Sequence, residues 1–357
     1  MELLDLPYEQ LVPIYRLCDF SDLVSYACVS TDAGKSVCEL LWHTVEVPWS
    51  ALLHDDFQRR NLDNLKYTRV LRFRIRSCPV NTWDAFKANF ERIVQHCDGE
   101  SIVSFDVEGV LGTDGLVTVC KSFHGLQNLT LSNCQPIDGA GWEALGELVG
   151  LRNFRTNYPM NVDIVQHLET IPNLHELVFG KQCCITSEVV QILPQLKSLS
   201  KLTVLDANGV DCDILQTNKK LSELNIENGT FSIATDPDFD IGGFGSLKKL
   251  GLVYCNNITE ETVVSLGQNA LLETLHVVGQ NWTDEKLVQL SQLPSLKVLD
   301  MGCGTNISLL GMSHVLTLNH LTHLYLYNCQ GMMCPLVSYR GPLEVTVDKF
   351  LPVPLSG

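Results

Sequence analysis

The sequence predicts an α/β fold built as a solenoid, in which each repeat supplies one short parallel strand and then a helical or irregular segment. Apolar residues recur in the pattern L-x-x-L-x-L, and the matches start 19 to 28 residues apart. Apolar residues alternate within each match, which is typical of strands. The matches begin at Ile102, Leu126, Leu151, Leu174, Leu202, Leu221, Leu247, Leu272, Leu296 and Leu321. The chain of 357 residues is too long for one compact core, whereas a stack of repeats extends its core lengthwise.

The spacing identifies the class of repeat. A sustained period of 20 to 29 residues with this apolar pattern is typical of leucine-rich repeats. One more match, "VLRFRIRSC" at residues 70–78, starts 32 residues before Ile102 and brings the total to about eleven repeats over residues 67–340. The matches that start at Leu151 and Leu202 are the poorest. We expect a horseshoe with parallel strands on its concave face.

Helix-start signals follow several of the strands. "ITSEVVQIL", "ITEETVVSLGQ" and "WTDEKLVQLSQL" each place a threonine before acidic residues and then apolar residues at helical spacing. Threonine is a common N-cap, and acids in the first turn suit the helix dipole. We therefore expect helices to begin after Thr186, Thr259 and Thr283.

Two segments flank the repeats. Residues 49–66 carry no clear pattern and are assigned to a linker or cap. In the tail at residues 341–357, Leu343, Val345 and Val347 alternate. This alternation predicts a last strand or lid that covers the open end of the stack.

Net charge and cysteine spacing limit the classes of partner and compartment. The net charge is −16 and the pI about 5.0, which argues against nucleic acid or an anionic membrane as the main partner. No apolar run is long enough to span a bilayer. The fourteen cysteines form no C-x-x-C pair, and the N-terminus does not resemble a signal peptide. We expect a reducing compartment, the cytosol or the nucleus.

Some of the cysteines recur at one position of the repeat. Cys78, Cys134, Cys255 and Cys329 each lie three residues after the last apolar residue of the pattern. A thiol tolerates burial and donates a weak hydrogen bond to a carbonyl, so we expect these residues to pack inside the stack rather than to react.

The first 48 residues lack the repeat pattern and predict a small helical domain. Apolar residues such as Leu11, Ile14 and Leu17 recur at helical spacing, and two further apolar faces follow before residue 46. Three short helices are too few to fold well alone, so they need the repeats or a partner to pack against.

This segment resembles an F-box. The resemblance lies in Leu6-Pro7, Glu9, Leu11, Ile14 and Leu17, then Asp22-Leu23, Val29-Ser30 and Leu41-Trp42, and it covers about residues 3–47. The repeat form L-x-x-L-x-L-x-x-C followed by "NNITEE" is similar to the cysteine-containing class of leucine-rich repeats, which is common behind an F-box.

The resemblance implies a substrate-recognition subunit of an SCF-type (cullin–RING) ubiquitin ligase, in which the F-box docks on the Skp adaptor and the repeats hold a protein substrate. By position, the adaptor-binding residues would be Leu6, Pro7, Glu9, Leu11, Ile14, Leu23 and Val29. Pro13 interrupts the first helix, and "TDAGKSV" lacks the basic residue and tryptophan usual in the family. The alternative is an interaction scaffold or inhibitor whose N-terminal helices only cap the stack.

The predicted binding residues lie between the inward leucines, on the concave face. They form a basic start, an acidic middle and an aromatic end. They are Arg72, Arg74, Arg76, Arg155, Glu176, Asp206, Glu223, Glu227, His276, His323, Tyr325 and Tyr327. The arginine stripe predicts either an acidic partner or pairing with Asp106 and Glu108 on the next strand.

We expect no catalytic site, metal or cofactor. Asp236, Asp238 and Asp240 imitate the start of a calcium loop, but Ile241 stands where that loop needs glycine. His320 and His323 would lie on opposite sides of a strand, which argues against joint zinc binding. The protein is therefore predicted to be a non-catalytic adaptor.

Overall fold

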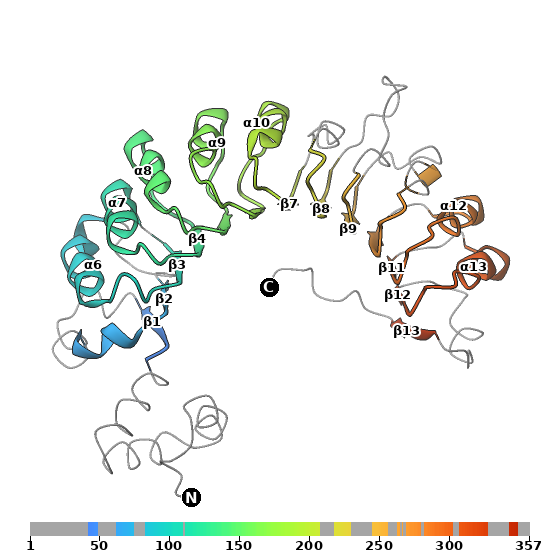
Figure 1. The fold of residues 1–357 in the computed structure, drawn as a ribbon, viewed down its shortest axis with the longest axis horizontal. Coiled ribbons are helices and arrows are strands. Elements are labelled where there is room, and N and C mark those ends of the chain that lie inside the picture. The colour runs from blue at the N-terminus through green and yellow to red at the C-terminus, as the bar shows by residue number, and fades with distance from the viewer. Residues whose placement is uncertain are drawn as a thin grey trace, which may run out of the picture. The chain divides into compact units, whose positions relative to one another are not determined.

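A computed structural model describes the chain at residues 42–48, 62–74, 83–109, 111–207, 218–229, 245–255, 263–264, 266, 269–279, 282–302, 307–327 and 343–348. The chain divides into two compact units, residues 1–158 and 159–357. Both consist of short parallel strands, each pairing with strands next to it in chain order, and Figure 1 shows helices along one side of these strands. One parallel strand per leucine-rich segment is the leucine-rich-repeat fold that the sequence predicts.

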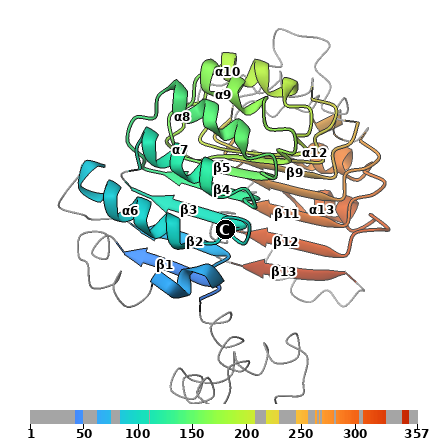
Figure 2. The same cartoon turned by 60° about the vertical axis from the view of Figure 1, so that its left-hand side comes forward.

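The N-terminal unit contains strands β1 to β5, which pair in register with their neighbours. Figure 2 shows β1 to β4 as neighbouring strands that run in one direction. The strands are β1 (Thr44–Pro48), β2 (Val70–Arg74), β3 (Ser104–Glu108), β4 (Asn128–Ser132) and β5 (Asn153–Thr156). The helices are η2 (Leu62–Tyr67), α6 (Asp84–His96), α7 (Thr113–Ser122), α8 (Gly139–Ala144) and η3 (Leu145–Glu147).

The C-terminal unit repeats the arrangement with β6 to β13, again with parallel pairing between neighbours. Its strands are β6 (Glu176–Phe179), β7 (Lys201–Leu205), β8 (Glu223–Glu227), β9 (Lys249–Val253), β10 (Thr274–Val278), β11 (Val298–Gly302), β12 (His323–Tyr327) and β13 (Glu344–Asp348). Its helices are α9 (Val162–Leu168), α10 (Ser187–Ile192), η4 (Leu193–Gln195), α12 (Asp284–Leu290) and α13 (Leu309–Val315).

Alternation within the strands builds the core of each unit. The second and fourth residues of a strand are buried, as in Leu129 and Leu131 of β4. In the N-terminal unit, aromatic side chains join the layers, because Phe73 of β2 lies 4.9 Å from Phe90 of α6 and 5.7 Å from Phe105 of β3, between ring centroids. The inward leucines predicted from the sequence are therefore the core.

Strand β7 corrects the predicted register of one repeat. Leu202 and Val204 pair with Leu224 and Ile226 of β8, so the repeat begins at Leu199, 25 residues after Leu174, and not at Leu202. Leu199, Leu202 and Val204 are buried, whereas Leu205 is half-exposed. The prediction failed because apolar residues at 199, 202, 204, 205 and 207 satisfy two registers, and lateral pairing selects one.

The first strands also differ from the prediction. The L-x-x-L-x-L pattern of the β2 repeat starts at the buried Thr68, two residues before Val70. Leu71 and Phe73 show this, because they pair with Phe105 and Val107 of the next repeat. Strand β1 pairs with β2 and lies inside the segment assigned to the helical domain, so the repeats extend at least as far back as residue 44. At the other end, β13 confirms the strand predicted in the tail.

Two of the predicted caps lie in described residues. The Thr283 side chain accepts a hydrogen bond from the Lys286 N–H and caps α12, as predicted. Thr186 precedes α10 but makes no side-chain cap bond. The predicted cap at Thr259 lies outside the described residues.

The residue that follows a strand often adopts left-handed backbone. These residues are Gly109, Asn133, Asp206, Asn228, Tyr254 and Gly279. Several donate their N–H to the next strand, as Tyr254 does to the Val278 carbonyl at 2.7 Å. Glycine, asparagine and aspartate suit this conformation, and Tyr254 is the exception.

Candidate partner-binding surface

We call the strand face that points away from the helices the open face. It carries the first, third and fifth residues of each strand, because the second and fourth residues of β1 to β12 are buried and β13 pairs in register with β12. In Figure 1 the helices of each unit lie on the other side of its strands. The open face is the surface to which the sequence assigned the binding residues, and it is described for each unit separately.

In the N-terminal unit, the arginine stripe is matched by acids on the next strand. Arg72 pairs in register with Asp106, and Arg74 with Glu108. The Arg72 Nε lies 3.8 Å from the Asp106 Oδ2, which is an ion pair too long for a hydrogen bond. Of the two predicted explanations for the stripe, the structure supports pairing for Arg72. Arg76 and the side chain of Arg74 lie outside the described residues.

Asparagine side chains also line this part of the open face. The Asn153 Nδ2 donates to the Asn128 Oδ1 at 2.5 Å, and the Asn128 Nδ2 donates to the Val103 carbonyl at 3.3 Å. Arg155 lies beside them in the third position of β5, half-buried and in register with Thr130. The sequence did not predict this asparagine pair, although the two residues stand at the same strand position of successive repeats.

In the C-terminal unit, the first positions of β6 to β9 alternate in charge. The Glu223 carboxylate accepts from the Lys201 Nζ at 2.9 Å and lies 3.3 Å from the Lys249 Nζ. Partial burial raises the pKa of Glu223, but the two lysines outweigh it and hold the pKa below its usual range. Hydrogen bonding to Glu223 raises the pKa of Lys201, to which Glu176 adds attraction. These charges are matched within the sheet.

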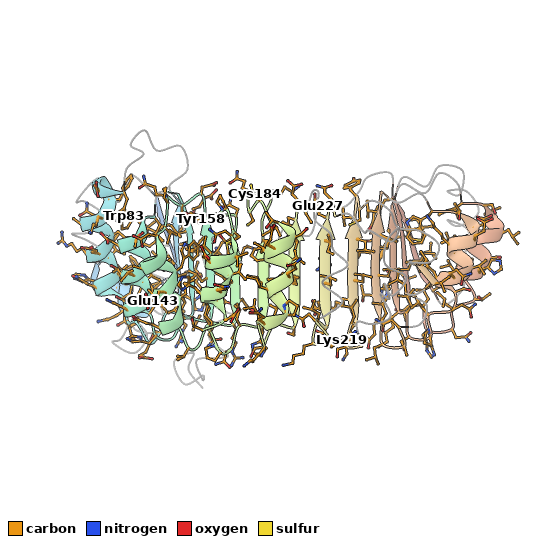
Figure 3. The ribbon with its side chains drawn as sticks, turned by 90° about the horizontal axis from the view of Figure 1, so that it is seen from above. Trp83, Glu143, Tyr158, Cys184, Lys219 and Glu227 are labelled. Carbon is orange, nitrogen blue, oxygen red and sulfur yellow. The ribbon has the colours of Figure 1, made fainter. Side chains whose placement is uncertain are left out.

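Two predicted acids lie near the ends of β7 and β8. Glu227, buried at the end of β8, accepts from the Lys181 Nζ at 3.0 Å. Asp206 was predicted on the strand face, but it follows β7 in left-handed backbone with φ of 74°, where its Oδ1 accepts from the Asn228 Nδ2. The cause is the shifted register of β7, which places Thr203 and Leu205 on the open face instead. Figure 3 shows Glu227 and Lys219 near opposite ends of the strands.

The aromatic end of the C-terminal unit combines histidine, tyrosine and acids. The His276 Nδ1 of β10 lies 3.0 Å from the Asp300 Oδ2 of β11, and both side chains are largely buried. The His323 and Tyr325 rings of β12 stack with centroids 6.1 Å apart. The His323 Nε2 lies 3.2 Å from the Glu344 Oε2 of β13. The last predicted residue, Tyr327, is on the same face but only 8% exposed.

The cysteines of the described ranges are buried thiols with one exposed member. Burial raises the pKa of Cys97, Cys120, Cys134 and Cys183 to about 12 and that of Cys255 to about 11. The Cys134 Sγ donates to the Ser132 carbonyl and the Cys255 Sγ to those of Ile226 and Val253. These contacts confirm the packing role predicted for these two residues, while Cys78 and Cys329 lie outside the described residues.

The predicted adaptor-binding residues (Leu6, Pro7, Glu9, Leu11, Ile14, Leu23 and Val29) all lie outside the described residues, as do Asp236, Asp238 and Asp240. Within the described ranges, no group of three or more His, Cys, Asp or Glu side chains has the geometry to hold a metal ion. None of the helices described is long and apolar enough to cross a membrane.

The strands and their registry define the fold as one of leucine-rich repeats. No protein-family model and no curated protein matches the chain. Among solved structures, the chain is similar to the crystal structure of an internalin from Listeria monocytogenes, with 15% sequence identity and a TM-score of 0.46. The similarity covers 75% of this chain and 69% of the internalin chain.

Proposed function

We propose that the protein is an interaction scaffold that binds a partner protein on the open face of its strands. The observation that carries the proposal is a sheet face on which none of the described helices packs and on which charged, polar and aromatic side chains stand in rows. Repeat proteins generally bind along such a face. The protein would contribute position and orientation and would do no chemistry itself.

In its more specific form, the proposal is that the scaffold is the substrate-recognition subunit of an SCF-type ubiquitin ligase in the cytosol or nucleus. The support is the resemblance of residues 3–47 to an F-box ahead of cysteine-containing repeats. The N-terminal segment would bind the Skp adaptor, and the open face would hold the protein to be ubiquitinated. The alternative is a scaffold or inhibitor without a ligase, which the interruption at Pro13 favours.

Co-expression with the Skp adaptor tests the ligase proposal. The full chain and a Leu11→Asp, Ile14→Asp variant are each purified with the adaptor and run on gel filtration, with circular dichroism to show that the variant stays folded. Co-elution of the native chain and not of the folded variant supports an F-box. A native chain that elutes alone at micromolar concentration rejects the ligase and leaves the scaffold.

Site-specific photo-crosslinking tests the scaffold itself. A photoreactive residue is placed in the full chain at Thr203 or Thr346, both on the open face, or at Glu285, exposed on helix α12. Binding on the open face predicts a protein adduct from position 203 or position 346 and little from position 285. Equal adducts from all three positions, or none from both 203 and 346, would reject the proposal.

A further inference from the structure

Acids and lysines are matched on one part of the open face of the C-terminal unit. Glu223 lies against Lys201 and Lys249, and Glu227 against Lys181. Each of these contacts joins a full negative to a full positive charge. The surface formed by β7 to β9 therefore offers little net charge to a partner.

The acids on β11 and β13 have a different environment. Among the side chains described there, Asp300 has an ion-pair contact only with His276, and Glu344 only with His323. Among the described side chains neither acid contacts a lysine or arginine, in contrast to the two acids of β8. The Asp300 Oδ1 is buried and accepts no hydrogen bond from a described residue. These two strands therefore carry carboxylates that no described lysine or arginine pairs with.

A tyrosine stands between the two acids. Tyr325 lies in register with Asp300 on one side and with Thr346 on the other, and its ring stacks on His323. The Glu344 side chain is 68% exposed. Carboxylates beside an aromatic face suit a guanidinium or ammonium group, which forms charge-assisted hydrogen bonds with the first and cation–π contacts with the second.

We propose that the open face of β10 to β13 binds an arginine- or lysine-bearing segment of the partner protein. This inference rests on the proposed function and names the chemistry of the partner. Asp300 and Glu344 would pair with the basic side chains, and Tyr325 would stack on one of them. The net charge of −16 would steer a basic segment toward the protein. The matched charges of β7 to β9 would contribute much less.

The test uses the full chain and a fluorescent 12-residue peptide of alternating Arg and Gly, with Glu in place of Arg in the control peptide. Binding is measured by fluorescence anisotropy at low and physiological salt. The variants are Asp300→Asn, Glu344→Gln, Tyr325→Ala and Tyr325→Phe. Glu285→Gln on α12 is the matched control, because it removes the same charge from the helix side. Thermal unfolding checks that each variant is folded.

We expect Asp300→Asn to weaken binding of the Arg peptide by about tenfold and the exposed Glu344→Gln by about threefold. Tyr325→Ala should weaken it by about fivefold, whereas Tyr325→Phe keeps the ring and most of the affinity. Glu285→Gln should stay within about twofold of the unmodified chain. Equal losses in Glu285→Gln and Asp300→Asn would show attraction by net charge alone and overturn the inference.

The inference and the proposed function fail separately. If the Arg peptide binds no better than the Glu peptide while position 203 or 346 still forms crosslinks, the partner is not basic and only the inference falls. If neither open-face position forms a crosslink, the proposed function falls as well.

Discussion

Gly279 should tolerate a side chain poorly, for two reasons that add. It follows β10 with φ of 79°, where an L-residue costs about 1–2 kcal/mol. A Cβ there would also lie 2.3 Å from the Cδ1 of Tyr254. Tyr254 is 43% exposed, so its ring can rotate away, which limits this second cost to about 1 kcal/mol. We therefore expect Gly279→Ala to lower the free energy of unfolding by about 2–3 kcal/mol.

Guanidinium unfolding followed by circular dichroism measures this cost. Gly139→Ala is the control, because a Cβ at this first residue of α8 meets no atom within 4 Å, and it should change stability by less than about 1 kcal/mol. Combining Tyr254→Ala with Gly279→Ala should remove the clash but keep the backbone cost. A Gly279→Ala chain within about 0.5 kcal/mol of the unmodified one would refute the reasoning, since that is the scatter expected of neutral surface changes.

Three further predictions test the register, the thiols and the charge ladder. In guanidinium unfolding, Leu199→Asp should prevent stable folding or lower the free energy of unfolding by more than about 3 kcal/mol, whereas Leu205→Asp on the open face should lower it by less than about 1 kcal/mol. Equal losses would contradict the register of β7. After brief maleimide labelling at pH 8, residue-resolved mass spectrometry should find the exposed Cys184 modified and Cys255 protected. The reason is that burial raises the pKa of the Cys255 thiol. Rapid labelling of both residues would contradict the burial of Cys255. Glu223→Gln should destabilise the protein by about 0.5 kcal/mol at pH 7. This difference in stability should vanish as the pH falls through the lowered pKa of Glu223, because the carboxylate then takes up a proton. A difference that persists in acid would show that the charge of Glu223 is not its cause.

The sequence predicted the repeat fold because its strongest signal, alternation within short segments at a steady period, is also what builds the core. It failed where that signal is ambiguous or weak. The leucines around Leu202 fit two registers, and pairing with β8 decides between them. At Thr68 a threonine occupies a buried position of the repeat pattern, and its Oγ1 has no hydrogen-bond partner among the described residues. The apolar pattern therefore missed the true start.

The binding face was predicted from the alternation of side chains along a strand, so an even shift in register keeps each residue on its face and an odd shift moves it to the other. The repeat pattern of β2 starts two residues earlier than predicted, at Thr68, and Arg72 therefore stays on the open face. The pattern of β7 starts three residues earlier, at Leu199, and Asp206 therefore leaves that face. The odd shift exchanges inward and outward residues. This explains why, of the two wrong starts, only the one at Leu202 displaced a predicted binding residue from the open face.

The adjacent strand, about one repeat away in the sequence, determines whether a charged residue remains available to a partner. Arg72 and Glu223 are each paired with a neighbour of opposite charge, although the sequence named both as binding residues. For Arg72 the sequence left pairing with Asp106 open as an alternative, whereas for Glu223 it gave no such indication. The strand pattern of the sequence also places Asp300 on this face, and among the described side chains its ion-pair contact is with His276. Lateral pairing therefore moves the candidate site from the charged middle of the repeats toward β11 to β13, where carboxylates and a tyrosine adjoin without a lysine or arginine contact among the described side chains.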